Sequence, residues 1–140
     1  MADGSTGPNY VLDKTFKLAT GETITGYQVV YQHTTAGECK VATGPGTPYL
    51  GVAQLDPNDG VTLTAGDSVR VRMMGISKVQ AAAAVAINGK VAVTGLGLVD
   101  DPAPYGAGSY YLGIALSAAT QLYDEIEVDL TNKNSQYFTS

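Results

Sequence analysis

Tyr49-Leu50-Gly51-Val52-Ala53 is the stretch that decides the fold, because the chain repeats it as Tyr111-Leu112-Gly113-Ile114-Ala115. Each copy follows a turn-forming segment that contains prolines, and each is followed, after a polar loop, by an alternating strand that begins with aspartate. These strands are residues 67–73 and 124–130. Two matches in the same order, with similar surroundings, predict an internal repeat.

The halves of this repeat extend over about residues 16–73 and 79–130. Overlaying them places Val30 on Val93, with a drift in spacing of the kind that loop insertions produce. The glycine of each repeated stretch is expected to allow close packing of the backbone. The apolar side chains of the two stretches are expected in a shared core, and these are Leu50, Val52, Leu112 and Ile114.

The composition favours short strands and tight turns. Hydrophobic residues make up 44% of the 140 residues and charged residues only 15%, which argues against a disordered chain. Glycine and tyrosine are abundant, and tryptophan is absent. We therefore predict an all-β fold with little helix, a compact β-barrel or sandwich of two similar halves. It forms a single domain over residues 14–130.

Residues 81–84 are four alanines and have the highest helix propensity in the chain. Their counterpart in the first half, residues 18–21, has no helical character, and Asn88-Gly89 just beyond is a hairpin-type signal. We predict a strand or loop here, with at most one helical turn.

Charge and cysteine usage exclude several classes of function. The net charge of −5 weighs against nucleic-acid binding, which depends on Lys and Arg meeting phosphates. Cys39 is the only cysteine, so the fold does not depend on an intrachain disulfide. No apolar run reaches the roughly 18 residues of a membrane span, and the start of the chain does not resemble a signal peptide. We expect a protein that is made in a cytoplasm and does not bind a membrane.

Both ends of the sequence are polar. Residues 1–13 are predicted to form an N-terminal arm, in which Tyr10, Val11 and Leu12 make a short apolar patch. A frayed terminus and an arm that orders on a partner surface are both open interpretations. Residues 131–140 are predicted to be a polar C-terminal tail that is mobile or lies on a neighbouring molecule.

The two Asp-led strands differ in the charge of their polar face. Alternation of side chains places Arg70 and Arg72 on that face in the first copy, and Glu127 and Asp129 at the equivalent positions of the second. Opposite charges at matching places suggest that these residues pair, either inside the domain or between subunits. The alternative is that both faces are simply solvated, which is the usual state of surface charges.

No group of residues indicates catalysis. His33 lies in a polar loop, and no Asn or Asp orients it toward Cys39, which we expect to be buried and structural. Asp56 and Asp59 are a possible cation pair but lack the spacing of an EF-hand, and turn formation explains them better. Neither Gly-rich segment has the features of a phosphate-binding loop. We predict no catalytic residue, no metal site and no cofactor.

The order of motifs resembles the small head decoration (cement) proteins of tailed phages. It comprises a Gly-led alternating strand, a Pro-containing turn, a Leu-Gly-Val/Ile-Ala strand and a Val-x-Val strand, with an Ala-rich segment between the copies. The resemblance covers about residues 16–130. The Leu-Gly-Val-Ala strand with the downstream Val-Arg-Val is its most telling part.

The resemblance implies a non-enzymatic, β-tulip-like protein that binds the outside of the expanded capsid and holds neighbouring major capsid subunits together. It implies the major capsid protein as partner, a homotrimer as the assembly and the capsid exterior of the virion as the location. Exposed tyrosines suit such an interface, namely Tyr105, Tyr110 and Tyr137. The segment implied to contact the capsid consists of Pro8, Asn9, Tyr10, Val11 and Leu12.

The alternative is a β-rich receptor- or glycan-binding module of a virion fibre or spike. The absence of tryptophan weighs against it, because sugar sites usually rely on aromatic platforms. A small enzyme is a third possibility, which the missing catalytic constellation disfavours.

Overall fold

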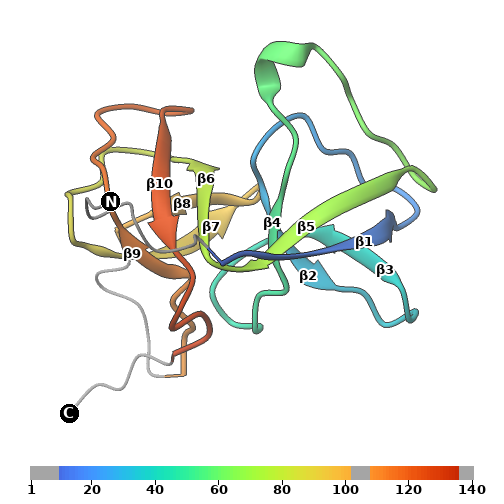
Figure 1. The fold of residues 1–140 in the computed structure, drawn as a ribbon, viewed down its shortest axis with the longest axis horizontal. Helices are drawn as coiled ribbons and strands as arrows, with labels where there is room; N and C mark the ends of the chain where they lie inside the picture. Colours follow the sequence, from blue (N-terminus) through green and yellow to red (C-terminus); the bar gives the residue numbers. More distant parts are fainter. Residues whose placement is uncertain (1–9, 102–107, 136–140) are drawn as a thin grey trace.

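The protein is a two-part, all-β molecule, and the computed structural model describes residues 10–101 and 108–135. Figure 1 shows two groups of strands side by side, the first (blue to green) at the right and the second (yellow to red) at the left. The only helix among the described residues is a single short 3-10 turn, so the predicted all-β fold is confirmed. None of the described helical segments is long and apolar enough to cross a membrane.

The first half is a closed barrel in which the strand order is β1-β3-β2-β4-β5. β1 and β3 run parallel, and the other neighbours are antiparallel. Its strands are β1 (Leu12–Leu18), β2 (Val29–Gln32), β3 (Glu38–Val41), β4 (Gly51–Ala53) and β5 (Ser68–Met74).

The second half repeats this arrangement as a five-stranded sheet of order β6-β10-β9-β7-β8. A single parallel bridge between Ala81 and Val99 links its two edges, at the place where β1 meets β3 in the first half. Its strands are β6 (Ile76–Gln80), β7 (Lys90–Gly95), β8 (Leu98–Asp100), β9 (Gly113–Ala115) and β10 (Glu125–Asp129).

The repeated glycines hold the same place in the two halves. A Cβ at Gly51 would lie 2.2 Å from the carbonyl oxygen of Arg72, and one at Gly113 would lie 2.1 Å from that of Asp129. Glycine therefore lets the backbone of the neighbouring strand approach closely, as the sequence predicted.

One part of the sequence overlay is wrong by two residues. Val30 pairs with Gly51 and Val91 pairs with Gly113, so the counterpart of Val30 is Val91 and not Val93. The reason is that the connection between the first two strands of the second half is shorter than that of the first half.

Two hydrophobic cores hold the molecule together. The first fills the barrel and contains Phe16, Leu18, Ile24, Val30, Cys39, Ala53, Val69 and Val71. The second belongs to the other half, but it also includes residues from the outer face of the barrel, namely Val29, Tyr31, Ala42, Tyr49 and Val52. Because side chains alternate along β2, Val30 points into the barrel while its neighbours pack against the second half.

The core prediction for the repeated stretches holds in part. Val52 and Leu112 are fully buried, and Leu50 is half-buried against the first core. Ile114 was expected in the core, but it is 37% exposed. It faces outward on β9 because the second half has no further unit packed on its outer side in the described chain.

The turns follow the chemistry of their residues. Asp67 and Asp124 cap equivalent turns, since each carboxylate accepts the backbone N–H of a threonine, Thr64 or Thr120. The hydrogen bonds from Thr120 lower the pKa of the Asp124 carboxyl. Residues 81–84 contain no helix, as the repeat predicted.

Candidate functional site

The first described residues form an exposed apolar stretch. Tyr10 is 82% exposed, Val11 is 43% exposed and Leu12 is 50% exposed. Leu12 pairs with Met74 at the end of β5, and Met74 is also exposed. We call Tyr10, Val11, Leu12 and Met74 the N-terminal patch. Large apolar side chains gathered on a surface typically mark a contact site.

This patch lies at the junction between the two halves. Gly75 joins β5 to β6, and its φ of 100° lies in the region that favours glycine. A Cβ there would lie 2.7 Å from the carbonyl oxygen of Tyr10 and 2.8 Å from Cγ1 of Val11. The N-terminal stretch therefore crosses directly over the connection. Pro8 and Asn9 lie outside the described residues, and contact of this segment with a capsid stays a prediction.

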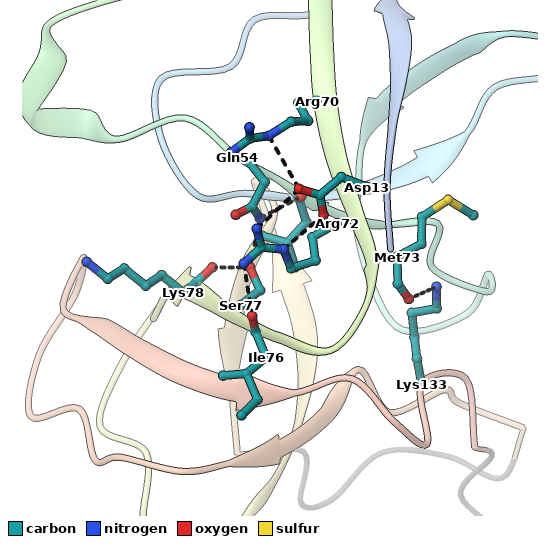
Figure 2. Close-up of polar contacts among 10 residues, drawn as sticks. Asp13, Gln54, Arg70, Arg72, Met73, Ile76, Ser77, Lys78 and Lys133 are labelled. Atoms are coloured by element: carbon teal, nitrogen blue, oxygen red, sulfur yellow. Dashed lines mark hydrogen bonds and ion pairs between the residues drawn. The ribbon is translucent and has the colours of Figure 1, made fainter. Parts of the chain in front are cut away.

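An ionic cluster fixes the start of β1 beside the patch (Figure 2). Nε and Nη2 of Arg72 donate to the two carboxylate oxygens of Asp13 at 2.9 and 3.1 Å, and Nε of Arg70 lies 3.4 Å from the same carboxylate. Nη1 of Arg72 also donates to the carbonyl of Ile76, which belongs to the second half. The hydrogen bond from Arg72 holds the pKa of Asp13 below its usual value.

The predicted partners of the arginines need correction within the chain. Arg70 and Arg72 meet Asp13 and not Glu127 or Asp129, because β1 is the strand that pairs with β5. β10 lies in the other half, where the two acids form no ion pair within the described part of the chain. Pairing of these charges between separate copies stays a prediction.

A clamp near the C-terminus ties the two halves together. Nζ of Lys133 donates to the carbonyls of Leu50 and Met73 at 2.7 and 2.9 Å, and Figure 2 shows the bond to Met73. The side chain of Asn134 accepts from the Tyr49 N–H and donates to the Tyr49 carbonyl. Burial lowers the pKa of Lys133. We call Lys133 and Asn134 the C-terminal clamp.

The sequence did not reveal this clamp. The sequence predicts that residues 131–140 are mobile or lie on a neighbouring molecule, whereas Lys133 and Asn134 bind the first half of the same chain. A lysine and an asparagine in a polar run carry no pattern that would distinguish a clamp from a solvated tail.

A groove of about 490 Å³ lies between β9 and the C-terminal segment. Its lining includes Lys90, Tyr111, Ile114, Asp129 and Asn132. Nζ of Lys90 lies 5.1 Å from the centre of the Tyr111 ring, a cation–π distance. An aromatic ring beside a carboxylate and an amide is able to contact a polar ligand.

The residues considered for catalysis have structural partners. Cys39 is fully buried, as predicted, and burial raises the pKa of its thiol to about 11, so it is not an activated nucleophile. His33 lies 3.5 Å from Glu38. Asp56 caps the 3-10 helix η1 (Pro57–Asp59) by accepting the Asn58 N–H. Within residues 10–101 and 108–135, no three His, Cys, Asp or Glu side chains are placed to hold a metal ion.

The tyrosines expected at an interface have different environments. Tyr110 is half-buried and packs against the second core, so it is not the exposed residue that we expected. Its backbone carbonyl accepts a hydrogen bond from the Tyr49 hydroxyl. Tyr105 and Tyr137 lie outside the described residues.

The fold defines an all-β protein with two five-stranded halves of matching strand order. The crystal structure of the head fiber gp8.5 N base in bacteriophage phi29 is similar to it, with a TM-score of 0.62 and 15% sequence identity. The match covers 91% of this chain and 100% of that chain. At this identity the likeness is one of fold. No family model matches the sequence, and no curated protein matches it.

Proposed function

We propose that this protein is a capsid decoration (cement) protein of a tailed phage. It binds the outer surface of the expanded head and bridges major capsid subunits. The N-terminal patch is the observation that carries the proposal, because it is an exposed apolar surface in a chain with few charged residues. The likeness of the fold to that of a phage head fiber base also supports a role on a phage head.

The patch offers backbone as well as side chains to a partner. β1 pairs with β5 from Leu12 to Lys17, but with β3 only at Lys17 and Leu18. The outer edge of residues 12–16 therefore has no strand partner among the described residues. An extended segment of the capsid protein adds to this edge, and Tyr10, Val11 and Leu12 fill pockets on the capsid surface.

The ionic cluster gives the arm a fixed direction. Because Arg72 holds both Asp13 on β1 and the Ile76 carbonyl in the second half, the start of β1 is fixed at the junction of the two halves. A contact segment that is fixed in this way resists separation of the subunits that the protein bridges. In this proposal the protein acts as a homotrimer on the capsid exterior after synthesis in the host cytoplasm, and it uses no cofactor or nucleic acid.

Sedimentation with expanded, undecorated capsids tests the proposal. We expect saturable binding of the native chain, and at least about tenfold weaker binding when residues Tyr10, Val11 and Leu12 are all changed to Ser, since tenfold corresponds to only 1.4 kcal/mol. The matched control is Ile87→Ser with Leu96→Ser, which removes exposed apolar side chains far from the patch in sequence. Native protein that fails to sediment with capsids would contradict the proposal. If the variant with serine at positions 10–12 binds as tightly as the native chain, the N-terminal arm is not the capsid-binding segment.

A receptor- or glycan-binding module of a virion fibre or spike is the second candidate. The groove beside Tyr111 favours it, because an aromatic ring with Asp129 and Asn132 nearby suits a sugar. Binding to a glycan array that is lost in Asp129→Asn and Asn132→Ala, without binding to capsids, would support this second function over the first.

A further inference from the structure

β9 has an exposed apolar face at a position that the first half buries. Val52 pairs with Arg72 and Ile114 pairs with Asp129, so the two apolar residues hold the same place in their halves. Val52 is fully buried against the second half, whereas Ile114 and Leu116 are 37% and 38% exposed. The second half thus leaves open a sheet face of the kind that serves as an internal interface in the first.

Three acids border this face along β10. Glu125, Glu127 and Asp129 alternate with the buried residues of the strand, so they share its outer side. Asp129 is the cross-strand neighbour of Ile114, and the Leu116 N–H donates to the Glu127 carbonyl. We call Ile114, Leu116 and the three acids the acidic face.

Two lysines lie in register with the acidic face, and the ammonium group of each lies over a tyrosine ring. Lys78 pairs with Glu127 in register, but its Nζ lies 5.9 Å from the centre of the Tyr27 ring. Lys90 pairs with Ile114, and its Nζ lies over the Tyr111 ring. None of the acids forms an ion pair in the part of the chain that the structure describes.

The equivalent surface of the first half has the opposite charge. Arg70 is the counterpart of Glu127, because Arg70 pairs with Thr15 of β1 and Glu127 pairs with Lys78 of β6. The Arg70 side chain is 61% exposed. Lys17 is exposed one step further along the same side of β1. Two acids border this row: Asp13, which is shared between two arginines, and Glu38 of β3, which is the register partner of Lys17. We call Lys17 and Arg70 the basic face, which continues into the apolar pair of Leu12 and Met74.

We propose that two copies of this chain associate head to tail, with the basic face of one copy against the acidic face of the next. Each face combines a charged row with an adjacent apolar pair, so the surfaces complement each other in charge and hydrophobicity. Because the two surfaces differ, the contact is heterologous and generates a closed ring or an open chain of copies. This inference deepens the proposed function, because a closed ring of three copies is the homotrimer proposed there, and it is tested on the free protein without capsids.

Charge reversal in the full chain tests this contact. In sedimentation velocity over a concentration series at low salt, the native chain self-associates, and Arg70→Glu and Glu127→Arg each weaken association about tenfold or more. The double variant R70E/E127R restores association, because the reversed charges attract again. Raising the salt concentration weakens the native contact.

Matched reversals on other surfaces serve as controls. Lys40→Glu and Asp59→Arg change exposed charges outside both faces and leave association unchanged. Circular dichroism melting shows whether each variant is folded, and Glu127→Arg alone is decisive if Arg70→Glu unfolds. A native chain that stays monomeric, reversals no stronger than the controls, or a double variant that fails to recover would each overturn the proposal.

Discussion

Gly51 and Gly113 occupy the tightest backbone positions of the repeat. A methyl group at either would lie within 2.2 Å of a carbonyl oxygen of the neighbouring strand, and that strand cannot move without disturbing its own pairing. We expect Gly113→Ala to lower the free energy of unfolding by about 1–3 kcal/mol, as overpacking of a core does. Gly44→Ala is the control, because nothing lies within 4 Å of its added Cβ. Urea denaturation measures both, and equal stability of the two variants would contradict the close approach.

Asp13 makes stability depend on pH in a defined direction. The hydrogen bond from Arg72 lowers its pKa in the folded protein below the ordinary 3.8. The stabilisation of the fold by the Asp13 carboxylate is therefore complete above about pH 4. It is lost as the pH falls through the lower pKa of the folded state. We expect Asp13→Asn to lower the free energy of unfolding by about 1–3 kcal/mol near neutral pH. The difference from the native chain should shrink only below about pH 4.

Urea denaturation of both proteins across this pH range provides the check. Asp59→Asn, at an exposed position without an ion pair among the described residues, is the matched control. A difference between native and Asp13→Asn protein that persists unchanged in acid would show that the carboxylate charge is not the cause.

Single residues also mark the limit of sequence reasoning. The alternation of the two Asp-led strands correctly placed the charged residues on one face of each strand, and the intervening Val69, Val71, Ile126 and Val128 are buried. It could not reveal which acid meets Arg72, because that depends on the pairing of β1 with β5 across the closed barrel. Ile114 was misplaced for a similar reason, since its exposure depends on what packs outside the sheet and not on its own strand.

The C-terminal clamp joins the segment after β10 to the first half. Asn134 satisfies both the N–H and the carbonyl of Tyr49, which is buried between the halves. We expect Asn134→Ala to cost about 1–3 kcal/mol of unfolding free energy, because it removes both hydrogen bonds from the Asn134 side chain to the Tyr49 backbone. Asn132→Ala is the matched control on the exposed side of the same segment. Thermal melting distinguishes them, and an unchanged melting temperature for Asn134→Ala would show that the clamp is not a structural tie.

The elements themselves could largely be predicted from the sequence. The strands β5 and β10 lie where the alternation of residues 67–73 and 124–130 placed them. The repeat also correctly overruled the helix propensity of residues 81–84, because tertiary context outweighs a weak local preference. The clamp could not be foreseen, because its bonds join residues that are far apart in the sequence: 60 positions separate Met73 from Lys133, and 85 separate Tyr49 from Asn134.

The molecule as a whole is expected to unfold as one unit. The second core includes Tyr31, Tyr49 and Val52 from the first half, so the second half has no complete core without the first. We expect a single calorimetric transition in which the calorimetric and van't Hoff enthalpies agree. Two resolved transitions would show that the halves are independent domains.

At this scale the sequence predicted two similar halves, and the matching strand orders confirm them. It did not predict that the first half closes into a barrel while the second is completed by a single bridge and by the outer face of the first. That asymmetry arises from packing between the halves, which no pattern within either half records.

The central claim is that the protein coats a capsid. The most direct test is the number and location of bound copies on expanded, undecorated capsids at saturation, measured by electron cryomicroscopy together with densitometry. The account predicts a fixed stoichiometry to the major capsid subunit, with density distributed regularly over the head surface at subunit junctions. Density confined to a tail or to a few isolated fibres, or no saturable density, would contradict it.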